Sequence, residues 1–243
     1  MQKVLFFFIL GLLFMSGNAQ DRKNVVKFLP VNLSLNSLSF EYERMINPKN
    51  SFEFGLGIPM NQTFVNKFSM DWSEEEEISN DEFGTFSLRA AYVHYTGSSS
   101  GPKGFYYSPY LKYQNVSASL SRINTIDDDE GSFSYNEDYH AAINTFGIGI
   151  QFGYQFLIAE RVTLDFYFLG FEAGLAGINA TIESSDITQV SEIESEIQDA
   201  VDDLPDFLNK KIDVSSGGNA VKVKAHSILY PWVRGGLSIG FAF

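Results

Sequence analysis

The sequence predicts an all-β chain in which eight antiparallel strands, in up-and-down order, close into a transmembrane β-barrel. Three observations predict this fold. Apolar residues alternate with small or polar residues in eight segments, and the connections between segments alternate between short and long. The chain also begins with an export-type leader. Alternation gives each strand two unlike faces, and the unequal connections distinguish the two ends of a barrel.

The composition argues against several classes of function. Asp and Glu number 30 against 17 Lys and Arg, so the net charge is -13 and a nucleic-acid partner is not expected. The absence of Cys excludes disulfides, thiolate catalysis and Cys-ligated zinc. The chain is rich in aromatic residues, with 23 Phe and 12 Tyr. Its mean hydropathy of -0.07 is too low for a bundle of membrane helices.

The first 19 residues have the organisation of a signal peptide. Lys3 supplies a positive start, residues 4–15 are an apolar run, and residues 17–19 form a small-residue cleavage site. The apolar run is too short to cross a bilayer as a helix. We therefore expect residues 1–19 to be a cleaved signal peptide and residues 20–243 to form one barrel domain. A retained N-terminal anchor is the alternative.

The first four segments carry apolar side chains at alternate positions, as expected of strands with one apolar face. The intervening positions hold small or polar residues. The apolar sets are Leu29, Val31, Leu33 and Leu35 in residues 25–35; Leu38, Phe40 and Tyr42 in 38–45; Phe52, Phe54, Leu56 and Ile58 in 51–58; and Phe86, Leu88, Ala90 and Tyr92 in 85–95.

The last four segments continue this pattern over residues 105–118, 145–156, 162–175 and 228–243. The clearest is 145–156, in which every second residue is Phe, Ile or Tyr and the others are Gly, Gln or Thr. The apolar positions of 162–175 change phase partway along the segment. One extra residue would explain that change, so we expect a β-bulge near Phe168.

Charged residues distinguish a barrel from a soluble β-sandwich, which is the alternative fold. In a sandwich, all the large apolar side chains would have to fit between sheets spaced roughly 10 Å apart. In a membrane barrel they face lipid, and the charges pair inside a lumen that side chains can fill. We expect a structural plug rather than a transport path. The expected lumen charge cluster comprises Glu41, Glu43, Glu53, Arg89, Lys112, Asp165 and Arg234.

The connections predict which end of the barrel faces outward. Short connections are typical of the periplasmic end and long ones of the outer end. The long outer loops are expected at residues 60–82, 119–140 and 176–226. They are strongly acidic, with dense runs at 74–77 and 127–130. Such runs indicate solvated surface, and the ligand spacing of a calcium loop is not met, so no metal site is expected.

The last long loop contains an amphipathic helix, over roughly residues 186–204. Its apolar residues recur at intervals of three and four positions, and acidic residues occupy the other side. Pro205 is expected to end or kink it. The helix either caps the barrel rim or docks a partner protein. Its apolar face comprises Val190, Ile193, Ile197, Val201 and Leu204.

Residues 39–44, 47–48, 51–57 and 231–243 together resemble small outer-membrane β-barrel proteins of Bacteroidota, many known only as domains of unknown function. The resemblance implies an outer-membrane location, contact with outer-membrane lipid and a barrel closed by its first and last strands. It implies no chemistry. The ending, with Phe241 and Phe243, also resembles the assembly signal read by the barrel-insertion machinery, which is therefore an expected partner.

No catalytic or cofactor-binding residues are predicted. Neither a nucleotide-binding loop nor a hydrolase or zinc-protease motif occurs. An outer-leaflet hydrolase would have to use His140 with Asp138, or His226 with Ser227. We therefore expect a non-enzymatic structural or interaction subunit, acting through its acidic outer loops and bound to another outer-membrane protein. The alternatives are a narrow channel or lateral route for small hydrophobic molecules, and an outer-leaflet enzyme.

Overall fold

The computed structural model describes residues 22–60, 82–97, 101–128, 131–185 and 187–243, with the backbone alone at 124–128, 131–134 and 187–189. The expected signal peptide, nearly all of the expected loop 60–82 and the acidic run 74–77 lie outside these residues. So do the side chains of the run 127–130.

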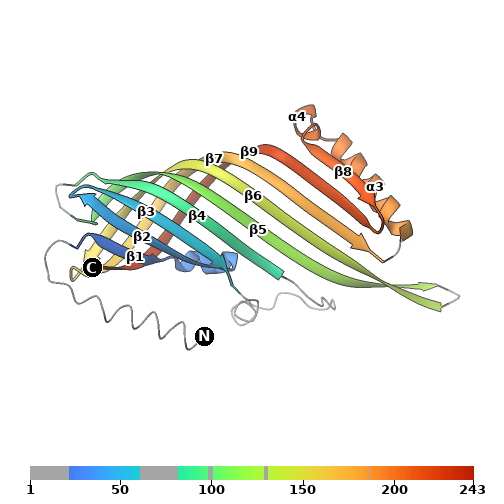
Figure 1. The fold of residues 1–243 in the computed structure, drawn as a ribbon, viewed down its shortest axis with the longest axis horizontal. Coiled ribbons are helices and arrows are strands. Elements are labelled where there is room, and N and C mark those ends of the chain that lie inside the picture. Colours follow the sequence, from blue (N-terminus) through green and yellow to red (C-terminus); the bar gives the residue numbers. More distant parts are fainter. Residues whose placement is uncertain (1–21, 61–81, 98–100, 129–130, 186) are drawn as a thin grey trace.

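The described residues form one antiparallel sheet and three helical segments (Figure 1). Each strand pairs with the next, and β9 pairs with both β7 and β1, so eight strands form a ring. β8 is attached only to β9. The elements are β1 (Asn24–Phe28), η1 (Pro30–Leu35), β2 (Ser37–Asn47), β3 (Asn50–Pro59), β4 (Glu82–Tyr95), β5 (Gly104–Asp128), β6 (Gly131–Ile158), β7 (Val162–Ser184), α3 (Ile187–Asp202), α4 (Asp206–Asn209), β8 (Ile212–Gly217) and β9 (Ala220–Ala242).

The ring is closed by the first and last strands. The β1–β9 register runs from Val25 opposite Ala242 to Phe28 opposite Ile239. Two further backbone hydrogen bonds, of 3.1 and 2.9 Å, join Asn24 and Phe243. Phe241 pairs with Val26 at this seam. Both residues of the expected assembly signal therefore lie at the seam, and their role in assembly stays a prediction.

The ring is uneven in height. β2, β3 and β4 have 10–14 residues, whereas β5, β6, β7 and β9 have 23–28. The long strands continue past the ring as one curved sheet, which carries β8 and α3 near its far end (Figure 1). We call this part, residues 119–140 and 176–226, the extension. The other end of the ring, with the turns near residues 48, 101 and 160, is called the turn end.

The extension corrects the expected loops at 119–140 and 176–226. Range 119–140 is almost entirely strand, and β5 and β6 stay paired from Ser119 opposite His140 to Asp128 opposite Gly131. Range 176–226 contains the end of β7, the helices α3 and α4, β8 and the start of β9. Each hairpin satisfies its own backbone hydrogen bonds, so the strands need no apolar face to continue. Part of the range 176–226 does alternate in the sequence, with Ile-Asn-Ala-Thr-Ile-Glu at 178–183 and Val-Lys-Val-Lys-Ala at 221–225.

The expected first strand, residues 25–35, is also corrected. The strand ends at Phe28 and the chain continues as the 3₁₀ helix η1, with Pro30 at its start. Proline has no N–H for a sheet ladder, and its fixed φ suits a helical turn. The inward face is different too, because Val25 and Lys27 are buried inside the ring. The alternating leucines and valine of 29–35 therefore do not form a strand face.

The expected bulge at Phe168 is confirmed. The β6–β7 register passes from Phe152 opposite Leu169 to Gly153 opposite Tyr167, so Phe168 is the extra residue. Phe168 and Leu169 are both exposed on the outside, while Tyr167 and Gly170 are both buried. The bulge thus keeps the inward positions polar or small on both sides of the phase change.

The ring reverses the usual distribution of side chains. Phe54, Ile148 and Phe168 are 59%, 63% and 60% exposed on the outer surface. The buried inward side chains are mostly polar or charged and include Lys27 and Glu43, at 1% and 0% exposed. The sheet is a single closed layer rather than two packed sheets.

The amphipathic helix is present as α3 and packs on the extension. Ser216 Oγ of β8 donates a 2.6 Å hydrogen bond to Glu194 Oε2 of α3. Val190 and Val201 are buried, Ile193 and Ile197 are half-buried, and Leu204 follows the helix end and is exposed. The chain's own sheet thus covers much of the apolar stripe. In the described part of the chain, no helix is both long and apolar enough to cross a membrane.

Candidate functional site

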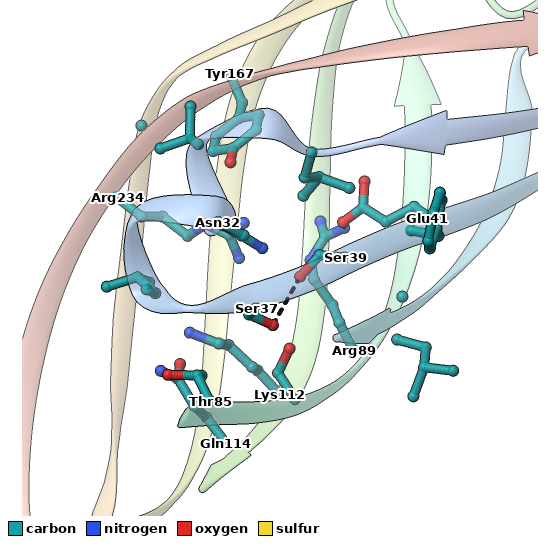
Figure 2. A pocket seen from close by; sticks show the side chains of 18 of the residues that line it. Asn32, Ser37, Ser39, Glu41, Thr85, Arg89, Lys112, Gln114, Tyr167 and Arg234 are labelled. Atoms are coloured by element: carbon teal, nitrogen blue, oxygen red, sulfur yellow. Dashed lines mark hydrogen bonds and ion pairs between the residues drawn. The ribbon is translucent and has the colours of Figure 1, made fainter. Parts of the chain in front are cut away.

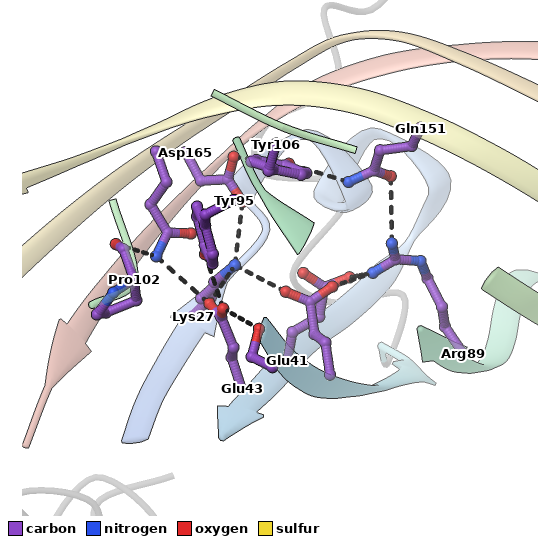
Figure 3. A network of polar contacts seen from close by, with 12 residues as sticks. Lys27, Glu41, Glu43, Arg89, Tyr95, Pro102, Tyr106, Gln151 and Asp165 are labelled. Atoms are coloured by element: carbon purple, nitrogen blue, oxygen red, sulfur yellow. Dashed lines mark hydrogen bonds and ion pairs between the residues drawn. The ribbon is translucent and has the colours of Figure 1, made fainter. Parts of the chain in front are cut away.

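The interior of the ring has two parts. A cavity lies beside η1 (Figure 2), and a network of ion pairs and hydrogen bonds fills the space toward the turn end (Figure 3). Both are built from inward positions of strands that are far apart in the sequence. An eight-stranded ring is narrow enough for side chains from opposite walls to meet.

Lys27 of β1 lies at the centre of the network. Its Nζ atom is 3.0 Å from Glu43 Oε2, 2.7 Å from Glu53 Oε2 and 3.0 Å from Asp165 Oδ2. These carboxylates come from β2, β3 and β7, and all four side chains are almost completely buried. Buried charges are tolerated when they are paired in this way.

Arg89 of β4 is the second cation of the network. Its Nη1 atom donates to Glu41 Oε1 at 2.9 Å and also to Glu53 Oε1. Its Nη2 atom donates to Gln151 Oε1 at 3.3 Å. Glu53 therefore connects the lysine and arginine parts of the network, and Gln151 extends the contacts to β6.

Neutral side chains complete the network. Tyr95 Oη donates to Glu43 Oε1 at 2.7 Å, and Tyr106 Oη donates to Asp165 Oδ1 at 2.8 Å. Gln155 Nε2 donates to the backbone oxygen of Pro102 at 2.8 Å, which ties the β4–β5 turn to the interior. The rings of Tyr95 and Tyr106 pack edge-on with centroids 5.7 Å apart. Protein side chains therefore fill this half of the ring.

The structure brings five residues of the expected lumen cluster into one network: Glu41, Glu43, Glu53, Arg89 and Asp165. Lys112 and Arg234 also belong to the interior, but they line the cavity together with Arg89 and make no ion pair with the network. The Arg234 guanidinium lies over the rings of Tyr110 and Tyr167, at 5.2 and 5.0 Å from their centroids.

Sequence reasoning missed the central cation and the inward tyrosines. Lys27 was missed because the expected strand 25–35 had the wrong inward face. Tyr106 and Tyr110 alternate with Phe105 and Tyr107, so residue type alone does not separate inward from outward positions. The inward glycines of β6 were the available signal. A Cβ atom on Gly153 would lie 2.5 Å from the hydroxyl of Tyr106, so glycine leaves room for the ring.

The cavity has a volume of about 260 Å³ and lies between η1 and the Arg89–Glu41 pair. Beside it, Glu172 accepts hydrogen bonds from Tyr110 Oη at 3.0 Å and Tyr230 Oη at 2.8 Å. Figure 2 shows the labelled polar side chains gathered around this space. Those from the strands are Ser37, Ser39, Glu41, Thr85, Arg89, Lys112, Gln114, Tyr167 and Arg234.

The histidines do not form a catalytic arrangement with the expected partners. His140 Nδ1 lies 3.0 Å from Ser119 Oγ, whereas Asp138 accepts a hydrogen bond from Ser121. His226 Nε2 is 3.9 Å from Asp213 Oδ2, and both side chains are exposed. Among the described residues, no group of three or more His, Asp or Glu has the arrangement of a metal site.

The extension also contains a tyrosine–glutamate contact on β6, in the part of the strand that pairs with the end of β7. Tyr139 Oη donates a 2.6 Å hydrogen bond to Glu137 Oε2. Burial, together with this hydrogen bond to a carboxylate, raises the pKa of Tyr139 to about 12. The phenol therefore stays protonated at neutral pH and acts as a donor.

Comparison of the chain with protein-family models, curated proteins and solved structures gives no match. The resemblance to outer-membrane proteins therefore rests on the residues quoted for it.

Proposed function

We propose that the chain is an outer-membrane β-barrel that anchors a rigid extension outside the membrane and acts as a non-enzymatic interaction subunit. The observation that carries this proposal is the reversed burial of the ring. Large apolar side chains such as Phe54, Ile148 and Phe168 surround the outside, and charges lie within. A continuous apolar belt is unfavourable in water, whereas lipid chains cover it at no such cost.

The network supports a lumen closed to solutes, against the alternative of a narrow channel. Lys27 contacts three carboxylates, and the hydroxyl groups of Tyr95 and Tyr106 occupy the remaining space around them. Opening a path would leave these charges without partners, which costs several kcal/mol per ion by general estimates. No observation specifically favours a lateral route for hydrophobic molecules.

The extension supports the interaction role. β4 pairs with β5 only as far as Glu82 opposite Ser119, so β5 beyond this point has one edge without a strand partner in the described part of the chain. β8 has the other such edge. An open edge can accept a strand of another protein. The acidic side of α3, with Glu192 and Glu196 exposed, favours a basic partner surface.

The test is expression with export, followed by membrane fractionation and gel electrophoresis with and without boiling. We expect the protein in the outer-membrane fraction, resistant to carbonate extraction, with folded and boiled forms that migrate differently. Ile148→Asp places a charge on the proposed lipid face and should weaken the folded band. A charge at the bilayer midplane costs about 2–4 kcal/mol for Arg or Lys and less for Asp. Ser215→Asp, on exposed β8, is the matched control. Release by carbonate and a single band would contradict the proposal.

A further inference from the structure

We propose that the cavity beside η1 is a binding site for a small phosphate-bearing ligand. This binding role goes beyond the anchoring function, because it concerns the part of the interior that the network does not fill. Arg89, Lys112 and Arg234, from β4, β5 and β9, line one space of about 260 Å³ (Figure 2). Three cations thus meet in one cavity of a chain whose net charge is -13.

Two of the three cations around the cavity have no direct ion pair, and Glu172 beside it attracts Lys112 only at longer range. Glu41, the carboxylate that lines it, accepts a 2.9 Å hydrogen bond from Arg89. Lys112 and Arg234 have no carboxylate within 4.0 Å in the part of the chain that the structure describes. Two positive charges therefore face the cavity without a direct ion pair. An anion between them would offset the cost of removing them from water.

Hydrogen-bond capacity is also unfilled around the same space. Arg234 Nη1, Arg89 Nε and Thr85 Oγ1 are buried and have no hydrogen-bond partner. Arg89 and Thr85 are only 8% and 3% exposed, so bulk water does not serve them freely. The planar guanidinium matches the paired oxygens of a phosphate or carboxylate, and lysine adds a point charge. The Arg234 guanidinium, the Lys112 ammonium and the unpartnered Nε of Arg89 in one cavity favour a phosphate, which offers three oxygens and up to two charges.

The rest of the lining limits the size and character of the ligand. The volume is slightly below the range of about 300–1,000 Å³ for typical small-molecule pockets, so a compact ligand is expected. Ser37 and Ser39 present hydroxyl groups 3.1 Å apart. Trp232 lines the cavity and is 60% exposed, so the lining includes an aromatic side chain that solvent also reaches. A phosphate group carried by a sugar or by a lipid headgroup satisfies these features.

The experiment uses the full chain in detergent micelles with Trp72→Phe, so that the fluorescence of Trp232 reports binding. Inorganic phosphate is titrated at constant ionic strength, with chloride as the replaced anion. We expect a saturable change with phosphate that chloride does not give. Lys112→Gln and Arg234→Gln should each weaken binding about tenfold or more, since each removes a charged donor. Lys210→Gln is the matched control, because that exposed side chain lies at the C-terminal end of α4 and does not line the cavity.

A second measurement keeps the test independent of the variants' ability to fold. Phosphate should raise the melting temperature of the unaltered protein, because a ligand of the folded state stabilises it by mass action. Three results would overturn the proposal. They are an equal response to chloride, no saturation at millimolar phosphate, and unchanged phosphate binding by Lys112→Gln and Arg234→Gln when both variants keep the folded band.

The source of the phosphate is distinguished by competition. Tighter binding of glucose 6-phosphate than of phosphate, with no competition from short-chain phosphatidic acid in the micelle, supports a free sugar phosphate. Competition by the phosphatidic acid, with no gain from the sugar, supports a lipid headgroup. Both results support the phosphate site and differ only in what carries the phosphate.

Discussion

Glu53 accepts hydrogen bonds from both cations of the network, with Oε2 2.7 Å from Lys27 Nζ and Oε1 bonded to Arg89 Nη1. One carboxylate on β3 therefore connects charges that enter from β1 and β4. Because the three side chains are almost completely buried, their mutual attraction is little screened by solvent.

Glu53→Gln should destabilise the ring, because two buried cations lose a shared negative charge. We expect a loss of about 3 kcal/mol in the free energy of unfolding, the lower part of the range for removing one partner of a buried pair. The measurement is urea unfolding in lipid vesicles, followed by tryptophan fluorescence. Glu192→Gln, on the exposed side of α3, is the control. Equal midpoints for the two variants would show that the network contributes little.

The purified protein should give no steady open conductance in a planar bilayer. Arg89→Ala should lower stability more than it opens a path, because Glu41 and Glu53 would lose their contact with the guanidinium. Current recording and unfolding of the same preparation check both parts. A stable large conductance from the unaltered protein would instead favour the channel alternative.

Gly153→Ala should destabilise the protein by about 1–3 kcal/mol, the usual cost of overpacking. The added Cβ would lie 2.5 Å from the Tyr106 hydroxyl and 2.8 Å from the backbone oxygen of Phe166. Gly217→Ala is the control, because nothing lies within 4 Å of a Cβ there. Thermal melting in detergent measures the difference. A neutral Gly153→Ala would mean that Tyr106 moves aside easily.

Val190→Asp should release α3 from the extension without unfolding the ring. Val190 is 4% exposed, and burying a charge there without a partner is costly. Limited proteolysis should cut within residues 185–211, while the heat-dependent gel shift of the ring is retained. Glu192→Ala should leave the proteolysis unchanged. Loss of the gel shift in Val190→Asp would mean that α3 stabilises the whole ring.

Deletion of Phe243 should reduce the amount of protein assembled in the outer membrane. The residue closes the seam through its two backbone hydrogen bonds to Asn24 and a 3.3 Å bond from Asn24 Nδ2. Without them the last strand loses pairing at its end, and both sheet edges are less well closed. Quantitative fractionation measures the effect. Normal assembly of the shortened chain would remove the terminal aromatic residue from the proposed signal.

The ring strands could be predicted from sequence where the two faces differ strongly in chemistry. Residues 145–156 and the bulge at Phe168 were located correctly because each outward position is apolar and each inward position small or polar. The same rule failed at Lys27, where Pro30 ends the strand and the leucines beyond belong to η1. It also missed the extension strands, although residues 178–183 and 221–225 alternate, because they lie within a range expected to form a loop.

The cluster was predicted in part for the same reason. Glu41, Glu43 and Glu53 stand out as charges between apolar neighbours, so their common inward face could be recognised. Which cation each carboxylate contacts could not be predicted, because these contacts depend on how distant strands are placed in the ring. Lys27, for example, contacts Asp165, which is 138 residues away in the sequence. The separation of Lys112 and Arg234 into a cavity depends on where η1 lies, which only the folded chain specifies.

The uneven height of the ring has a consequence for electrostatics. β9 continues through residues 220–229, a stretch of roughly 33 Å at the rise of a strand, and α3 packs near its far end. The Debye length at physiological ionic strength is about 8 Å. With the ring in a bilayer, the carboxylates of α3 would therefore lie several screening lengths from the anionic headgroups. In that arrangement the acidic helix would meet a basic partner without repulsion from the bilayer surface.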